Sequence, residues 1–351
     1  MATTIHDVAR AAGVSVATVS RVFTRPSSVR DATRQRVLSA AGGLGYQPNR
    51  AARGLITGKT GNIGLVVPDL GNPYFHAVLK GAQARAHQAD YAVFIADSQE
   101  QSHEEAALIR AMGKQVDGIV LCSPRMSPKR LAASAATPPL VLLGRTVPGL
   151  PAVTHDSADG MKQAVAHLAE LGHRRVAFVS GPRNSWSNRQ RHKGLAAASR
   201  AARIETVVFG PTPPQFEGGA EVAERVLAAG VSAVLAYNDL IAIGLLHRLG
   251  ELGVAVPDEV SVVGFDDIPF AAMSTPPLTT VAMPTELAGR AAVTLMLDRL
   301  AAGPDAPRGD VRTLPVALVV RGSTAPPATA TPARVPPPPM VVVVAAAGAR
   351  T

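Results

Sequence analysis

The chain of 351 residues has little cysteine, few aromatic side chains and no long apolar run. Its single cysteine, Cys122, excludes a disulfide within the chain, which is typical of proteins kept in a reducing compartment. No apolar run approaches the ~20 residues that span a bilayer. The first residues also lack the basic and then apolar pattern of a secretory signal. We therefore expect a cytoplasmic protein with no membrane partner.

The sequence also lacks the motifs that mark the common enzyme and metal-site classes. Its nine histidines are scattered without the spacing of metal ligands. We find no GxSxG turn for a nucleophilic serine and no Walker-type phosphate loop. These absences favour a protein without catalytic activity, cofactor or bound metal.

Acidic residues are scarce in the first 60 positions. This segment holds nine Lys or Arg against two Asp and no Glu, a surplus of seven, whereas the whole chain has a net charge of +9. Residues 61–325 carry 24 basic and 24 acidic side chains. A positive field confined to one end attracts phosphate, so we expect the N-terminal segment to bind nucleic acid.

Residues 4–22 have the pattern of two short helices joined by a tight turn. Thr4 followed by Asp7 is typical of a capped helix start, and an apolar stripe runs along the helix that follows. Gly13 can adopt the left-handed conformation that ends a helix, and Ser15 can cap a second one. This arrangement is the helix-turn-helix signature, whose second helix enters the major groove of DNA.

The second helix is expected to turn Val19 and Val22 towards the first helix. Its outward face consists of Val16, Ala17, Ser20 and Arg21. Arg21 can donate two hydrogen bonds to guanine, and small apolar side chains suit thymine methyl groups. A plain helical hairpin with a solvated Arg21 is the alternative.

A third helix is predicted over residues 31–44, and a conditional helix follows over 48–56. The inward positions of the third helix are Val37, Ala41 and Leu44. The later segment is shorter than the ~12–15 residues that an isolated helix needs, so we expect it to form only on a partner. Leu55 after two arginines is typical of a side chain wedged into the minor groove, although a linker with a buried Leu55 fits the spacing as well.

Together these residues resemble the DNA-binding head of the lactose and galactose repressor family (LacI/GalR). The matching stretches are Thr4-Ile5-x-Asp7-Val8-Ala9, Ala12-Gly13-Val14-Ser15, Thr18-Val19-Ser20-Arg21-Val22, Thr33-Arg34, Leu44-Gly45-Tyr46 and Pro48-Asn49-x-x-Ala52-Arg53-x-Leu55. The resemblance implies base contacts from Val16, Ala17 and Arg21. It implies phosphate contacts from Thr4, Ser15, Thr18, Ser20 and Asn49, and a paired hinge helix that places Ala52, Arg53 and Leu55 in the minor groove. The chain departs from the family pattern at Thr24, at Arg30, where a capping Ser is usual, and at Gly42-Gly43.

Residues 61–325 alternate short apolar runs with helical patterns. The candidate strands are Ile63–Val67, Ala92–Ala96, Gly118–Leu121, Leu140–Leu143, Val176–Val179, Val207–Phe209, Ala233–Ala236 and Val260–Gly264. Helical stretches include 75–89, 159–171, 218–229 and 239–252. The alternation predicts an α/β fold with parallel sheets, either one barrel or two open sheets. The resemblance, which extends to about residue 322, implies two doubly wound lobes like those of periplasmic sugar-binding proteins, with a ligand cleft between them.

Ligands of open α/β sheets bind at the carboxyl ends of the strands, so polar residues that follow a strand are candidate ligand contacts. The predicted effector-binding set is Tyr74, Phe75, Asp97, Arg145, Asp156, Ser185, Trp186, Ser187, Arg191, Asn238 and Asp266. The resemblance favours Asp156, Arg191 and Asp266 as contacts. Trp186, in a predicted loop, could stack on a sugar ring or serve as a lid or interface residue. Asp239 could cap a helix or bind the ligand.

We therefore predict a head over residues 1–47, a hinge over 48–60, an effector and dimerisation domain over 61–325, and a disordered tail over 326–351. The predicted function is that of a homodimeric repressor that binds a palindromic operator in double-stranded DNA and is controlled by a small molecule such as a sugar. In this prediction the effector changes the angle between the lobes and thereby moves the hinge helices. Two alternatives are a sugar-binding protein without a DNA role and a DNA-binding protein without a ligand. The basic head argues against the first, and the neutral body argues against the second.

Overall fold

A computed structural model describes residues 3–46, 59–134, 138–303 and 309–328. The chain divides into two compact units. Unit 1 comprises Met1–Gly71, Phe75–Thr154 and Thr285–Thr313, and unit 2 comprises Asn72–Tyr74, His155–Pro284 and Leu314–Thr351. Among the helices in the described ranges, none has the length and apolar character to cross a membrane.

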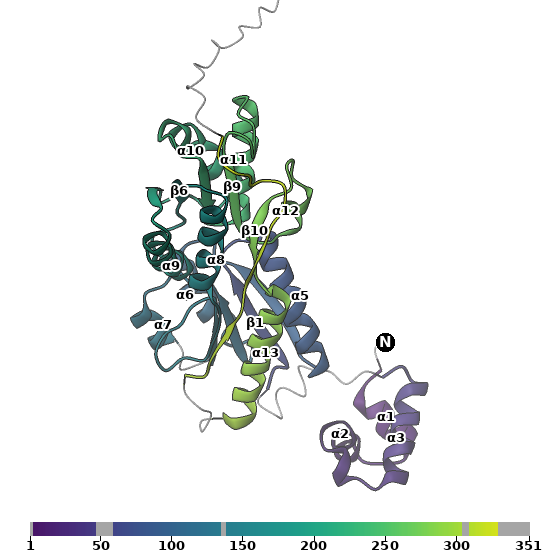
Figure 1. The fold of residues 1–351 in the computed structure, drawn as a ribbon. Helices are drawn as coiled ribbons and strands as arrows, with labels where there is room; N and C mark the ends of the chain where they lie inside the picture. The colour runs from purple at the N-terminus through teal and green to yellow at the C-terminus, as the bar shows by residue number, and fades with distance from the viewer. Residues whose placement is uncertain (1–2, 47–58, 135–137, 304–308, 329–351) are drawn as a thin grey trace, which may run out of the picture. The chain divides into compact units, whose positions relative to one another are not determined.

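The N-terminal head is a bundle of short helices (Figure 1). Its elements are α1 (Ile5–Ala12), α2 (Val16–Thr24), the 3-10 turn η1 (Pro26–Ser28) and α3 (Asp31–Gly43). Val8, Val19 and Val37, one from each α-helix, are completely buried and form the centre of its core. Gly13 ends α1 with a φ of 61°, which confirms the predicted turn between the first two helices.

Two further predictions for this region have different outcomes. Leu44 is 40% exposed, so its predicted inward orientation was wrong: α3 ends at Gly43, and Leu44 forms the C-cap beyond the helical stripe. The predicted hinge segment, with Asn49, Ala52, Arg53 and Leu55, lies outside the described residues.

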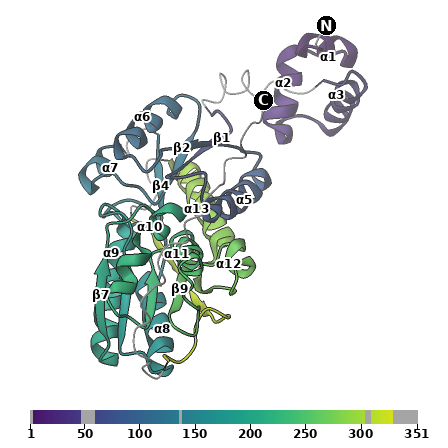
Figure 2. The same ribbon diagram turned by 90° about the horizontal axis from the view of Figure 1, so that it is seen from above.

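Unit 1 contains a six-stranded sheet of strand order β11-β5-β4-β3-β1-β2. Its strands are β1 (Asn62–Val67), β2 (Ala92–Asp97), β3 (Gly118–Cys122), β4 (Leu140–Leu143), β5 (Ala152–His155) and β11 (Val311–Leu314). The associated helices are α5 (Pro73–Gln88), α6 (Ser102–Met112), α7 (Pro128–Ser134) and α13 (Thr285–Ala302). Apolar residues of α6 and α7 share one core with β3 and β4, whereas α13 packs on β3 and β4 and lies beside α5 (Figure 2).

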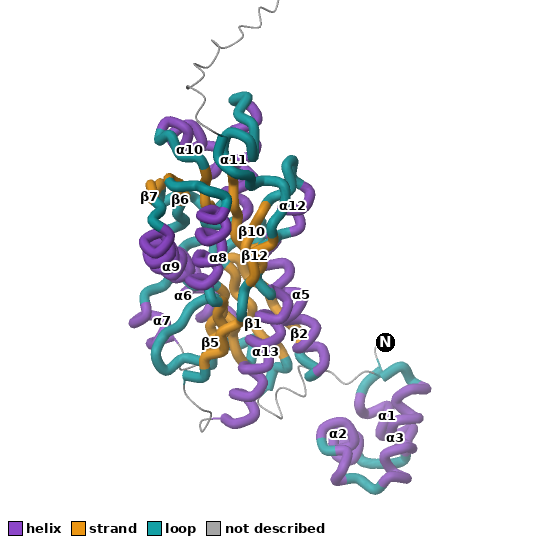
Figure 3. The backbone as a smooth tube through the Cα atoms, viewed as in Figure 1, coloured by secondary structure: helices purple, strands orange, loops and turns teal. Residues whose placement is uncertain are grey.

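Unit 2 contains a second six-stranded sheet of order β12-β10-β9-β8-β6-β7. Its strands are β6 (Arg175–Val179), β7 (Glu205–Phe209), β8 (Ala233–Ala236), β9 (Ser261–Asp266), β10 (Thr279–Ala282) and β12 (Ala317–Val319). Its helices are α8 (Ser157–Glu170), α9 (Trp186–Ala202), α10 (Phe216–Ala228), α11 (Asp239–Glu251) and α12 (Pro269–Met273). Alternate residues of β6 and β8 point into two separate cores, one with α8 and α9 and the other with α10 and α11, so helices cover both faces (Figure 3).

All eight predicted strands are present, and the two open sheets exclude the barrel that the periodicity had left open. The predicted helices match α5, α8, α10 and α11 to within two residues at each end. Four strands, β5, β10, β11 and β12, were missed. Each has only three or four residues, and β12 pairs antiparallel with β10, outside the βαβ rhythm that guided the prediction.

Candidate functional sites

The second helix of the head presents a short exposed face. Ser15 caps α2 by accepting a hydrogen bond from the Thr18 amide at 3.1 Å, as predicted. Ala17 and Arg21 are exposed, and the Arg21 Nε donates to the Ala17 carbonyl at 3.3 Å. Val16 is half-buried against the head core, so it is less outward than predicted. The face can therefore offer a guanidinium and small apolar groups to a base edge.

The hydroxyl groups predicted to contact phosphate lie at helix starts and on α2. Thr4 donates from Oγ1 to the Asp7 carboxylate at 2.7 Å, which is the predicted pairing and lowers the pKa of Asp7. The Ser15 and Thr18 hydroxyls lie 2.9 Å apart, and Ser20 is half-buried. The same head carries five exposed arginines, namely Arg10, Arg21, Arg25, Arg30 and Arg36. Such a surface suits a polyanion.

In unit 2 the predicted residues Arg191 and Asp266 form a buried ion pair. The Arg191 Nη2 donates to Asp266 Oδ1 at 3.3 Å, and the two side chains are 3% and 8% exposed. The guanidinium carbon lies 3.7 Å from the Phe265 ring centroid and 4.6 Å from that of Tyr237, whose carbonyl accepts from Nη1. Aromatic rings on two strand ends thus fix the orientation of the guanidinium.

Asp266 ends β9 in an uncommon backbone conformation. Its φ is 124°, and Asp267 follows with a φ of 58°. Burial raises the pKa of Asp266, while the nearby Arg191 charge and its hydrogen bond act in the opposite direction and favour the ionised carboxylate. Strained backbone and a displaced pKa at a strand's carboxyl end are both typical of ligand sites.

His155, which was not predicted, lies close to this pair. It is 4% exposed, its Nε2 has no hydrogen-bond partner among the described residues, and its ring meets that of Tyr74 edge-on at 6.3 Å. Burial and the Arg191 charge lower the pKa of His155 to about 4, so the imidazole is neutral at physiological pH. No sequence pattern marks this residue, because β5 was not predicted and only its neighbour Asp156 was taken as a candidate ligand contact.

Other predicted ligand residues of unit 2 cap helices. Ser185 caps α9 and bonds the Tyr237 hydroxyl at 3.0 Å, and Asn238 caps α11 and donates to the Pro214 carbonyl at 2.8 Å. Asp156 is exposed and caps α8. The cap of α11 is thus Asn238 and not Asp239, whose buried carboxylate accepts from the Thr280 hydroxyl and the Ile268 amide.

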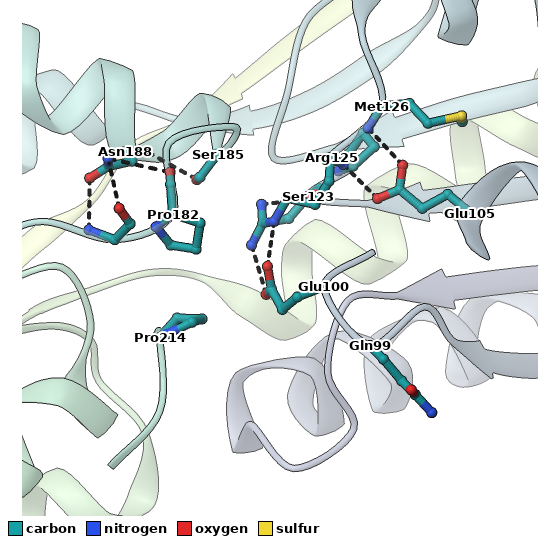
Figure 4. Close-up of polar contacts among 12 residues, drawn as sticks. Gln99, Glu100, Glu105, Ser123, Arg125, Met126, Pro182, Ser185, Asn188 and Pro214 are labelled. Atoms are coloured by element: carbon teal, nitrogen blue, oxygen red, sulfur yellow. Dashed lines mark hydrogen bonds and ion pairs between the residues drawn. The ribbon is translucent and has the colours of Figure 1, made fainter. Parts of the chain in front are cut away.

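Trp186 is the first residue of α9, so its predicted loop position was wrong. The cap at Ser185 starts the helix there, although nothing in the local apolar pattern indicates it. Trp186 and Ser187 are both half-buried in the first turn. Asn188, missed by the prediction, bonds the backbone of Gly181 and so fixes the loop before the helix (Figure 4).

Three predicted ligand residues belong to unit 1, and Phe75, Asp97 and Arg145 each have a different structural environment. Phe75 is buried in the first turn of α5, and Asp97 accepts hydrogen bonds from backbone amides of the loops after β1 and β2. Arg145 is buried and donates to the carbonyls of Pro124 and Met126 at 2.9 and 2.7 Å. Asp97 and Arg145 thereby hold the loops at the carboxyl edge of the sheet.

An ion pair at this edge, between a buried arginine and a half-buried glutamate, was missed by the prediction. Arg125 donates from Nε and Nη2 to the two carboxylate oxygens of Glu100, at 2.5 and 2.8 Å (Figure 4). Glu105, also buried, accepts from the amides of Arg125 and Met126. Burial raises the pKa of Glu105, and these hydrogen bonds oppose that change. Glu100 and Ser123 have positive φ values of 60° and 42°, which no sequence pattern reveals for these residue types.

Nearly the whole chain is similar in sequence to known proteins. Residues 4–49 match the model of bacterial regulatory proteins of the lacI family, and residues 165–324 match a periplasmic binding protein-like domain. The HTH-type transcriptional repressor CytR of Escherichia coli is 33% identical over 92% of this chain and 96% of its own length.

Two solved structures are similar throughout. The lac repressor dimer bound to operator and the anti-inducer ONPF gives a TM-score of 0.81 at 27% identity, covering 93% of this chain and 100% of that one. A complex of the transcriptional regulator CelR with cellobiose gives 0.68 at 30% identity, covering 92% and 99%.

Proposed function

Because this chain belongs to the LacI family of DNA-binding transcriptional regulators, we propose that it is a homodimeric repressor whose operator binding is controlled by a small, sugar-like effector. The observation that carries the DNA-binding part is the exposed pair Ala17 and Arg21 on α2. The opposite side of the same helix buries Val19 and Val22 in the head core. Two such heads in a twofold dimer would read the two halves of a palindrome.

The effector part rests on unit 2. Its buried ion pair joins Asp266, the last residue of β9, to Arg191 in the second turn of α9. The Arg191 guanidinium also lies against the Phe265 and Tyr237 rings, as expected for a site that binds a small polar molecule. The resemblance to a regulator solved with cellobiose favours a sugar as the class of ligand. Coupling between this site and the head must be reciprocal, so operator DNA would change effector affinity by the same factor as effector changes operator affinity.

The test first selects, from a random library, the DNA duplexes that bind the purified full-length protein. The selected palindrome and a shuffled duplex are then compared by gel mobility at several salt concentrations. We expect Arg21→Ala to lose about 1–3 kcal/mol of preference for the selected sequence.

Arg10→Ala provides the matched control. It removes one exposed charge from α1, where Arg10 lies 3.6 Å from Asp7, and leaves α2 intact. It should weaken binding to both duplexes alike. Full sequence preference in Arg21→Ala would refute the assignment of α2 as the reading helix.

A further inference from the structure

Two buried polar atoms of unit 2 have no hydrogen-bond partner in the part of the chain that the structure describes. They are His155 Nε2 and Arg191 Nε, on side chains that are 4% and 3% exposed. Buried polar atoms in native proteins are nearly always hydrogen-bonded, so such an atom beside a binding site indicates a group that arrives from outside the protein. The two side chains are near enough for the Arg191 charge to perturb His155.

The surroundings define which chemistry these atoms offer. Arg191 is fixed by its bonds to the Tyr237 carbonyl and the Asp266 carboxylate, so Nε–H remains as an available donor. Burial and Arg191 together keep His155 neutral, because both lower its pKa. A neutral imidazole protonated at Nδ1 can accept at Nε2.

Hydroxyl groups match both atoms, since a hydroxyl oxygen can accept from Arg191 Nε–H and a hydroxyl proton can be donated to His155 Nε2. A phosphate or carboxylate group can only accept. It would also lie near the Asp266 carboxylate, at a place where the Arg191 charge is already paired and His155 resists protonation. An added buried anion would therefore lack a counter-charge.

We propose, building on the function proposed above, that His155 contacts the effector through Nε2 and, together with Arg191 Nε, selects an uncharged ligand with neighbouring hydroxyl groups over its anionic analogue. His155 is thus a specificity-determining residue of the ligand site in unit 2.

The experiment measures binding to the full-length protein by titration calorimetry, with paired probes. The neutral probes are D-ribose, D-glucose, cellobiose and uridine. The charged partners are D-ribose 5-phosphate, D-glucose 6-phosphate, cellobionate and uridine 5′-phosphate. We expect at least one neutral probe to bind more tightly than its charged partner.

Variants then test His155 itself. His155→Phe and His155→Leu remove the ring nitrogen and should weaken that binding about tenfold, as expected for one lost hydrogen bond, whereas His155→Gln should restore part of it. His167→Gln is the matched control, because His167 belongs to the same unit but bonds Thr324, and it should bind as the wild type does. Operator binding by each variant serves as the check on folding.

Three results would overturn the proposal: equal binding by wild type and both apolar variants, tighter binding of a charged partner, or no binding by any neutral probe. If operator DNA is still bound in these cases, the regulator function stands and only the ligand assignment fails. Loss of operator binding by the wild type itself would instead refute the proposed function.

Discussion

Arg191 and Asp266 face each other across 3.3 Å in a region where both side chains are nearly inaccessible to water. Arg191 comes from the second turn of α9 and Asp266 from the last residue of β9, so the pair joins a helix to the strand end beside it. Two opposite charges so deeply buried contribute little net stability once desolvation is counted. The pair is therefore weak evidence for a role in stability, which agrees with the ligand-binding role proposed for it.

The first prediction follows from this pair. Asp266→Asn keeps the shape of the side chain but removes the acceptor charge, so we expect any stabilisation of unit 2 by a neutral sugar to be lost while operator binding stays within about twofold. Thermal unfolding with and without the sugars, and gel mobility with the selected palindrome, would measure both. Asp267→Asn is the control, since Asp267 bonds Arg321 at 2.7 Å and should leave the response intact.

The second prediction concerns acid stability. The pKa of His155 is lowered to about 4 in the folded protein from about 6.5 when unfolded, so the unfolded chain binds more protons between these values. The stability contributed by neutral His155 is complete above pH 6.5 and is lost as the pH falls through 4. Relative to His155→Gln, the wild type should lose about 3 kcal/mol of unfolding free energy over this range. Chemical unfolding at several pH values would measure it, and parallel curves for the two proteins would contradict it.

The parts of the site that were predictable from sequence obey short-range rules. The Thr4 and Asp7 pairing, the turn at Gly13 and the cap at Ser15 each involve residues within a few positions of one another, and all three were confirmed. Leu44 was misplaced because the end of α3 depends on where the chain turns, and the stripe alone does not show this.

The residues that were missed depend on contacts between distant segments. Arg125 meets Glu100 only because the loops after β2 and β3 converge at one edge of the sheet, and the left-handed conformation of Glu100 helps to place that carboxylate. His155 becomes unusual only when Tyr74 and Arg191 are brought to it from other elements. Neither hydrophobic periodicity nor a local sequence motif encodes contacts between segments that are distant in the sequence.

The third prediction tests close helix packing in unit 2. A Cβ at Gly219 of α10 would lie 2.0 Å from the Ile241 carbonyl oxygen of α11, and backbone cannot move aside as a side chain can. Gly219→Ala should therefore lower the unfolding free energy by about 3 kcal/mol. Gly250→Ala is the matched control, because a Cβ there meets no atom within 4 Å, and it should stabilise α11 by up to about 1 kcal/mol. Calorimetry would measure the melting temperatures of both variants. Similar melting temperatures for Gly219→Ala and Gly250→Ala would contradict the packing argument.

The fourth prediction concerns the Arg125 and Glu100 pair. The Arg125 side chain is 3% exposed, so Glu100→Gln leaves a buried guanidinium without its carboxylate and should cost about 3 kcal/mol of unfolding free energy. The double variant Glu100→Gln with Arg125→Met removes both charges and should recover much of that loss.

An exposed pair in the same unit gives the comparison. Lys80 and Glu286 lie 2.6 Å apart but are 74% and 52% exposed, so Glu286→Gln should change stability by less than about 1 kcal/mol. The two pairs have nearly equal N–O distances, so a larger loss for Glu100→Gln than for Glu286→Gln reflects the burial and the two-bond geometry of the Arg125 pair. Equal losses, or a double variant no more stable than Glu100→Gln alone, would show that the cost comes from the altered loop backbone and not from an unpaired charge.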